Sequence, residues 1–217
     1  MSIIVVLLFT VPVISDAQAN KKAQFIFTNA TTPTYKKAGK DKLNTKLSPS
    51  VYKQYGKSGK WIKVKKSNGQ YVWISSSKKL TSIQSTKYKK MEKEIMNLVN
   101  IERKKRGLTK LQQSNHLQQI TYLRNYDLAK ENYFEHTSPK YGRWANFLYT
   151  SEYDFAYAGE NIAAGFVTAK GFVNAWMNSP THRANILNPR FKKIAVGVSD
   201  GTSKSYFKTY ATQWFSD

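Results

Sequence analysis

The chain has 217 residues, of which 41% are hydrophobic and 14% aromatic, a composition that supports a packed core and excludes an intrinsically disordered chain. Its 35 Lys and Arg residues outnumber 13 Asp and Glu, giving a formal net charge of +22 at pH 7, so polyanions should concentrate around the protein. The sequence has no cysteine, which excludes disulfides, a cysteine nucleophile and thiolate metal ligands.

Residues 1–19 have the pattern of a secretory signal. The apolar run from Ile3 to Val13 is too short to span a bilayer, and Ala17-Gln18-Ala19 fits the small-residue pattern of a cleavage site. Met1 and Ser2 do not supply the usual basic charge. We predict cleavage after Ala19 and an exported protein. No other apolar run is long enough to cross a membrane, so we expect no transmembrane segment in the mature chain.

Residues 20–82 are predicted to form a basic β module, followed by a linker and helix start over residues 83–90. Residues 20–86 contain fifteen Lys, no Arg and a single acid. Apolar residues alternate over residues 61–64 and 70–74, and Asn68-Gly69 between these runs is a strong hairpin signal. We therefore expect a small barrel of about five strands.

Three segments of this module, at residues 32–37, 59–64 and 69–74, resemble bacterial SH3-like modules. Modules of that family often lie next to an extracellular domain in the same chain and bind peptidoglycan or another wall polymer. The resemblance implies the same role here. The candidate binding groove consists of four aromatic residues: Tyr35, Trp61, Tyr71 and Trp73. The alternative is that the Trp side chains fill the core of the barrel.

Residues 91–217 are predicted to form a separate α+β domain. Apolar residues recur at three- and four-residue spacing over residues 87–106, which predicts a helix, and Gly107 follows at a typical helix end. Further helices are expected over residues 114–131 and 168–179, the latter ending before Pro180. Strands over residues 194–198 and 206–215 would form a terminal hairpin.

Two of the three histidines, His136 and His182, lie on either side of Glu160 in the sequence. Two imidazoles and a carboxylate could hold a divalent ion, or the carboxylate could orient an imidazole for proton transfer. The spacing alone leaves open whether the three residues form one site. The third histidine, His116, has no motif around it and is predicted to be a surface or core residue.

Four segments, in order, resemble the bacterial branch of the CAP superfamily of cysteine-rich secretory, antigen 5 and pathogenesis-related proteins. They are His-Thr-Ser-Pro (136–139), Ala-Gly-Glu-Asn-Ile-Ala (158–163), Ala-Trp-Met-Asn-Ser-Pro-Thr-His-Arg-Ala-Asn-Ile-Leu-Asn-Pro (175–189) and Ile-Ala-Val-Gly-Val (194–198). The resemblance implies an α-β-α sandwich whose cavity binds a divalent metal, zinc first, through His136, Glu160 and His182. Asn161 of the same motif and Asn174, which stands where many eukaryotic members have a second acid, are further candidate binding residues of this cavity.

The resemblance implies a secreted, wall-associated binding protein, with an anionic wall polymer or peptidoglycan as partner and a small, lipid or peptide ligand in the cavity. One alternative is a metal-dependent hydrolase acting on wall, peptide or nucleic acid; another is a structural or adhesive wall protein with a vestigial pocket. The sequence contains neither Gly-x-Ser-x-Gly nor His-Glu-x-x-His. Apart from the His/Glu/His pocket, therefore, no established catalytic motif indicates an enzyme. Nucleic acid is a less favoured partner, because no base-reading motif is present.

Overall fold

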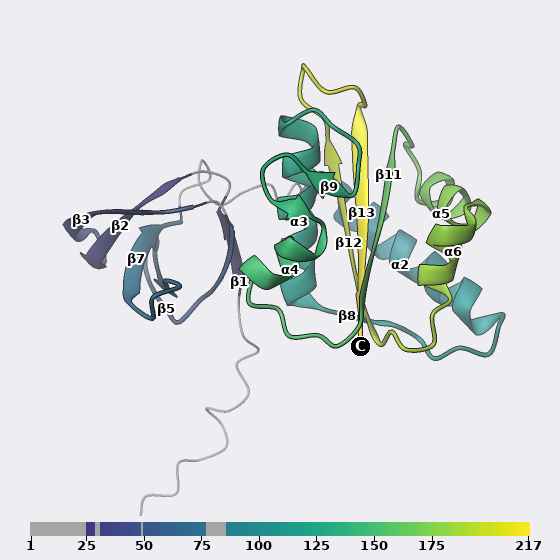
Figure 1. The fold of residues 1–217 in the computed structure, drawn as a ribbon, viewed down its shortest axis with the longest axis horizontal. Helices are drawn as coiled ribbons and strands as arrows, with labels where there is room; N and C mark the ends of the chain where they lie inside the picture. The colour runs from purple at the N-terminus through teal and green to yellow at the C-terminus, as the bar shows by residue number, and fades with distance from the viewer. Residues whose placement is uncertain (1–24, 29–30, 49, 77–85) are drawn as a thin grey trace, which may run out of the picture.

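The computed structural model describes residues 25–28, 31–48, 50–76 and 86–217. The predicted signal at residues 1–19 and residues 83–85 of the predicted linker lie outside these ranges. The described chain forms a β module followed by a mixed α/β domain (Figure 1). No helix in the described ranges has the length and apolar character needed to cross a bilayer.

The β module contains seven strands: β1 (Phe25–Thr28), β2 (Thr32–Lys37), β3 (Lys40–Leu47), β4 (Ser50–Lys53), β5 (Gly56–Ser58), β6 (Trp61–Lys65) and β7 (Tyr71–Ser75). Five of them form an antiparallel sheet in the order β3-β2-β7-β6-β5, while β1 pairs with β4. Within the described residues the sheet is open, with β3 and β5 at opposite edges, so the predicted closed barrel is not formed.

The hairpin predicted around Asn68-Gly69 is confirmed as β6 and β7. One face of this hairpin is buried and made of Ile62, Val64, Val72 and Ile74, as alternating apolar residues require of a half-buried strand. At the turn the Lys66 amide donates to the Gln70 carbonyl at 2.8 Å. Gly69 has φ +84°, a conformation that glycine adopts without a steric cost.

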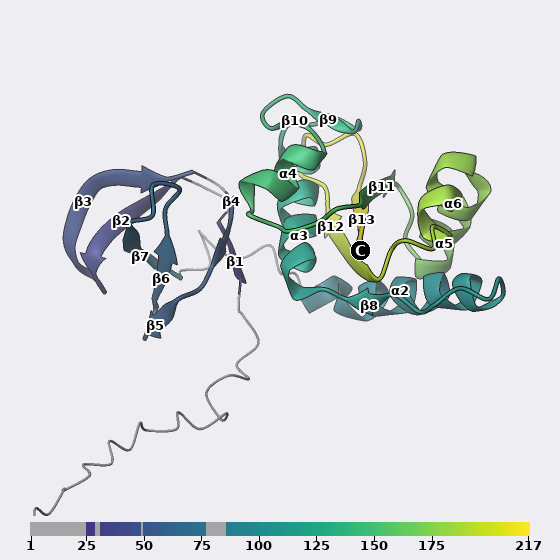
Figure 2. The same cartoon turned by 60° about the horizontal axis from the view of Figure 1, so that its bottom comes forward.

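The α/β domain is a three-layer sandwich. Its central sheet has the order β11-β13-β12-β8, formed by β8 (Gln112–Gln113), β11 (Ala158–Ala164), β12 (Lys193–Asp200) and β13 (Thr209–Ser216). One face is covered by α3 (Asn115–Lys130) and α4 (Ala145–Thr150), and the other by α2 (Lys89–Lys104), α5 (Ala169–Asn178) and α6 (Pro180–Ile186), as Figures 1 and 2 show. The predicted α-β-α arrangement of this domain is confirmed. A 3-10 turn, Thr86–Tyr88, leads into α2, and the short strands β9 (Thr137–Ser138) and β10 (Gly142–Arg143) pair after α3.

The predicted helices and terminal hairpin of this domain are present with small shifts of their ends. The Ser114 and Thr168 side chains cap α3 and α5 by accepting from the amides of Leu117 and Gly171, a common way to begin a helix. Pro180 both follows α5 and begins α6, because proline is well suited to the first turn of a helix. The sequence pattern predicts only a helix end at this proline, so α6 is an additional helix.

The β module contacts the sandwich through its β1–β4 pair. Val51 of β4 is 3% exposed and packs with Leu117 and Phe147 in the core on the α3 side of the sheet. The Ser50 hydroxyl donates to the Thr150 carbonyl at 3.3 Å. β1 also lies against α3. This pair is thus held against the second domain instead of closing the sheet of its own module.

Candidate functional site

His136 and Glu160 meet at the edge strand β11. Glu160 has no exposed side-chain surface, and its Oε1 accepts a hydrogen bond from His136 Nδ1 at 2.8 Å. The His136 side chain is 47% exposed. With Nδ1 held by the carboxylate, Nε2 is the nitrogen that can meet a ligand, a proton or an ion. A carboxylate that holds an imidazole in this way fixes its tautomer and orientation.

Arg124 of α3 holds the Glu160 carboxylate as well. Its Nε donates to Oε2 at 2.8 Å and its Nη2 to Oε1 at 3.2 Å, and both side chains are fully buried. Arg124 also donates to the Tyr133 hydroxyl and to the Glu135 carbonyl, in the loop that leads to His136. The arginine therefore fixes both Glu160 and the loop that carries His136.

Arg124 was missed by the sequence interpretation, although a signal existed. It lies four residues after Ile120 and four before Leu128, both fully buried, so it falls on the apolar face of its helix. An arginine in that position needs a buried anionic partner, because an unpaired buried charge is costly.

His182, near the start of α6, lies close to His136. The two imidazole rings have centroids 6.4 Å apart. Burial, and secondarily the nearby His136, lower the pKa of His182, which favours a neutral ring. Two imidazoles at this distance could contact one small ligand or one ion.

The Asn161 side chain positions α6 and does not face the two imidazoles. It is fully buried, its Nδ2 donates to the His182 carbonyl and to Gln213 Oε1, both at 3.1 Å, and its Oδ1 accepts from Asn185. Gly159 leaves room for the same contact, since a Cβ there would lie 2.9 Å from Asn185 Oδ1. This packing explains the Gly-Glu-Asn sequence. Gly159 and Asn161 allow α6 to pack closely against β11, and Glu160 provides the carboxylate that binds His136. Asn174 is an exposed residue on α5.

Of the three predicted metal ligands, only the two histidines are placed to bind a metal ion. Both oxygens of Glu160 are already bound by Arg124, and one also by His136, so the carboxylate is placed to orient an imidazole and not to bind an ion directly. Among the residues that the structure describes, no group of three or more His, Asp or Glu side chains is arranged to hold a metal. The two imidazoles are the ligands that the site could offer.

The four aromatic residues predicted as a groove lie on one face of the five-stranded sheet, the face opposite the buried Ile62, Val64, Val72 and Ile74. The cross-strand pairs form a row over the sheet: Lys42, Tyr35, Trp73, Lys63 and Gly56. We call this surface, with Trp61 and Tyr71, the lysine–aromatic face. Its Trp residues are half-buried, and neither belongs to the apolar core of the module.

Lysines and rings contact one another on this face. Lys63 Nζ lies 5.1 Å from the centroid of Tyr71, and Lys60 Nζ lies 6.0 Å from that of Trp61. Tyr35 and Trp61 meet edge to face at 4.8 Å. Cations and aromatic rings side by side suit a ligand that carries both negative groups and apolar or sugar-like surface.

His116 lies apart from the other two histidines, at the junction of the modules. Its Nε2 donates to the Ser151 carbonyl at 2.9 Å, and its ring meets Tyr153 edge to face. The prediction that it is a surface or core histidine agrees with this half-buried position.

Curated relatives of this chain are found in Bacillus subtilis (strain 168). The uncharacterized protein YkwD is 42% identical over 112 residues, which are 52% of this chain and 44% of that protein. The uncharacterized membrane protein YlbC is 35% identical over 139 residues, or 64% of this chain and 38% of that protein. The chain thus spans less than half the length of these relatives.

Solved structures share the fold. An outer surface protein from Borrelia burgdorferi has a TM-score of 0.52 at 22% identity, and the match covers 59% of this chain and 94% of that protein. An extracellular SCP-domain protein from Bacillus anthracis str. Ames has a TM-score of 0.53 at 19% identity, covering 87% of this chain and 68% of its own. The model of the cysteine-rich secretory protein family matches residues 96–215, more than half of the chain. The chain belongs to the cysteine-rich secretory protein (CAP) family.

Proposed function

We propose that this is a secreted CAP-domain protein that attaches to the cell wall by binding an anionic polymer with its lysine–aromatic face. The single observation that carries the proposal is the row of Lys42, Tyr35, Trp73 and Lys63 across four neighbouring strands. The signal pattern of residues 1–19 supports export, as do structural relatives described as outer-surface and extracellular proteins.

The charge of the β module favours a polyanion over a neutral glycan. Residues 20–86 have fifteen lysines and one acid, and three of these lysines, Lys53, Lys60 and Lys63, lie beside aromatic rings. Lysine ammonium groups act as mobile point charges and attract a repeated negative charge without demanding one ligand geometry. Aromatic rings add contact with the backbone of the polymer.

The test is co-sedimentation of the full chain with isolated cell walls, before and after extraction of their anionic polymers. We expect wild-type protein to bind intact walls and to be released near 1 M salt, where the screening length falls to about 3 Å. Tyr35→Ala/Trp73→Ala should weaken binding by about fivefold or more, corresponding to the loss of about 1 kcal/mol.

The matched control is Tyr149→Ala, which removes a tyrosine 66% exposed on the other domain and should bind as wild type does. Equal binding by the face variant and this control would reject the lysine–aromatic face. Undiminished binding to extracted walls would reject the anionic polymer and favour peptidoglycan.

We propose in addition that His136 and His182 receive a ligand or a divalent ion, zinc first, with Glu160 orienting His136. The observation that favours this role is the exposed His136 ring held at Nδ1 by a carboxylate that Arg124 fixes. A bound ion would supply Lewis acidity, whereas the chain itself supplies one oriented imidazole and a second, neutral one nearby. A small lipid or peptide ligand could contact the same two rings.

Calorimetric titration with zinc distinguishes the possibilities. Binding by the wild type that His136→Ala/His182→Ala abolishes would support the ion site and justify a screen for hydrolysis of wall, peptide and nucleic acid. Flat titrations for both proteins would reject the ion and favour an organic ligand or a structural pocket. His116→Ala is the matched control, because it removes a histidine outside the site.

A further inference from the structure

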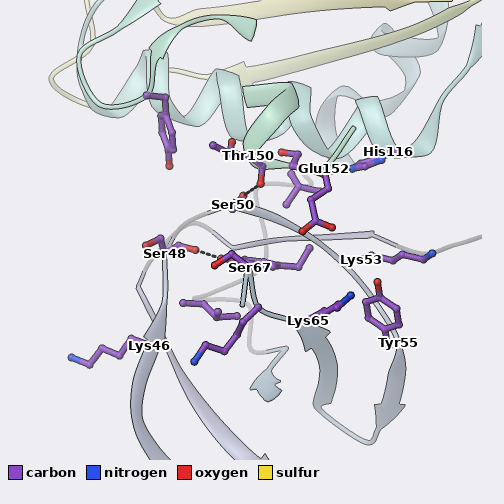
Figure 3. Close-up of a pocket in the computed structure, with 16 residues that line it drawn as sticks. Lys46, Ser48, Ser50, Lys53, Tyr55, Lys65, Ser67, His116, Thr150 and Glu152 are labelled. Carbon is purple, nitrogen blue, oxygen red and sulfur yellow. Dashed lines mark hydrogen bonds between the residues drawn. The ribbon is translucent and has the colours of Figure 1, made fainter. Parts of the chain in front are cut away.

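A lysine-lined hollow lies between the two modules. It is a cleft of about 570 Å³, with one wall formed by the β module and the other by the start of α3 and the chain after α4 (Figure 3). None of His136, Glu160 and His182 lines it. It is therefore separate from the CAP-domain site, and we call it the junction cleft.

The charges that line the junction cleft are strongly unequal. Lys46, Lys53, Lys65 and Lys66 come from the β module, and Glu152 is the one acidic residue in the described lining. Among the residues that the structure describes, no ion pair includes Glu152 or any of these lysines. Positive charge in a cleft with protein walls attracts anions more strongly than the same charge on a flat surface.

The floor of the junction cleft is packed against the sandwich. Val51, which lines it, is packed in the core of the sandwich, and Ser50 donates to the Thr150 carbonyl. His116 also lines the cleft and is held by the Ser151 carbonyl. The two walls are thus joined at their base by buried apolar contacts and a hydrogen bond, so the cleft belongs to the folded molecule.

The junction cleft is continuous with the lysine–aromatic face. Tyr55 at its rim meets Tyr71 of that face with ring centroids 5.0 Å apart, and Lys53 Nζ lies 5.5 Å from the centroid of Tyr55. Lys65 of the cleft pairs across the strands with the same Tyr71. A chain-like ligand on the face could therefore continue into the cleft.

We propose that the junction cleft is a second binding site, one that takes a segment of a linear polyanion with repeated phosphodiester or carboxylate groups. The lining favours a polymer over a compact metabolite, because flexible lysines select charge density and provide few fixed donors for one shape. The inference goes beyond the wall-binding face, since it assigns an anion site to the contact between the modules. It rests on the proposed function only for the cellular source of the polymer.

The probes are a labelled short polyphosphate, a labelled polyglutamate of equal charge and uncharged dextran, each titrated into the full-length mature chain by fluorescence anisotropy. Lys53→Gln/Lys66→Gln should weaken polyanion binding by about three- to tenfold, as expected for the loss of two ion pairs in an open cleft. Glu152→Gln should strengthen it by about two- to threefold, because the one opposing charge in the described lining is removed.

The matched control is Lys104→Gln/Lys170→Gln, which removes the same charge from two exposed positions on α2 and α5, on the other side of the central sheet. If the cleft pair binds as this control does, or if Glu152→Gln weakens binding, the proposal is overturned. Equal affinities for both polyanions would identify charge density as the feature recognised, and tighter binding of polyphosphate would identify the phosphate group.

Failure of the cleft and failure of the face give different results. Loss of binding in Tyr35→Ala/Trp73→Ala alone would retain the face and reject the cleft. Loss in Lys53→Gln/Lys66→Gln alone would do the reverse, because neither lysine belongs to the cross-strand pairs of the face. Binding of dextran as tight as that of the polyanions would reject the cleft as an anion site.

Discussion

Arg124 and Glu160 form the buried ion pair around which the CAP-domain site is built. Neither side chain has solvent-exposed surface. Replacing Arg124 with Met would leave the carboxylate buried without its cation, so we expect the free energy of unfolding to fall by about 3–5 kcal/mol. Urea denaturation measures the change.

A matched surface pair provides the control for this prediction. Arg106 binds Glu102 at 2.8 Å, and the Arg106 side chain is 43% exposed, so Arg106→Met should cost less than about 1 kcal/mol. Similar losses of unfolding free energy in both variants would show that burial does not increase the cost of removing Arg124.

His116 makes the stability of the protein depend on pH. Burial, and to a lesser extent the charge of Lys53, lower the pKa of His116 to about 4, while its hydrogen bond to Ser151 opposes the shift. The unfolded chain therefore binds this proton more readily than the folded protein. The stabilisation is fully present above the ordinary pKa near 6.5 and is lost as the pH falls toward about 4.

We expect this histidine to account for a loss of about 1–2 kcal/mol between about pH 7 and pH 4.5, a figure reduced for its partial exposure. Denaturation at both pH values, for wild type and His116→Gln, isolates the contribution from those of the carboxylates. An identical pH dependence in the two proteins would contradict the prediction.

At the scale of elements, the contact between α3 and β12 depends on a glycine. A Cβ built at Gly197 would lie 2.8 Å from Thr121 Oγ1 and 2.9 Å from Thr121 Cβ. Gly197→Ala would force the helix away from the sheet, so we expect a loss of about 1–3 kcal/mol in thermal or urea unfolding. Gly56→Ala is the control, because its Cβ would lie 3.5 Å from the nearest atom; a neutral Gly197→Ala would contradict the close approach.

At the scale of the whole molecule, Val51 couples the two modules. Its side chain is contributed by the β module but is buried in the core of the sandwich. We expect wild type to unfold in one calorimetric transition and Val51→Asp in two, because a buried unpaired carboxylate separates the modules. Val167→Asp changes a residue 74% exposed and should retain one transition; two transitions in wild type would contradict the coupling.

The elements that could be predicted from sequence are those whose signal is local. The helices α2 and α3 follow from the spacing of their apolar residues, and the β6–β7 hairpin follows from alternation around Asn68-Gly69. α6 was missed because Pro180 is consistent with both an end and a start of a helix. β11 was missed because its small and polar residues carry no strand pattern, and only its pairing with β13 makes it a strand.

The candidate site was predictable in its residues but not in their arrangement. Sequence motifs identified His136, Glu160 and His182, whereas Arg124, the partner that fixes Glu160, lies 36 residues away in α3 and belongs to none of these motifs. Glu92 is similar: it is buried in α2 and accepts from the Val198 amide at 2.9 Å. Such charged residues are interpretable only once their distant partners are known. The prediction of a closed barrel was wrong because it also depended on a distant contact. No local signal shows that Val51 packs on the other domain.

The open sheet of the β module leaves the outer side of β3 without a neighbouring strand among the described residues. Exposed strand edges invite pairing between copies of a protein, which leads to aggregation. β3 carries Lys40, Lys42 and Lys46, all exposed. Two copies that approach edge to edge would bring these like charges together, so the lysines of this strand also act as a barrier that keeps concentrated protein from assembling through its own backbone.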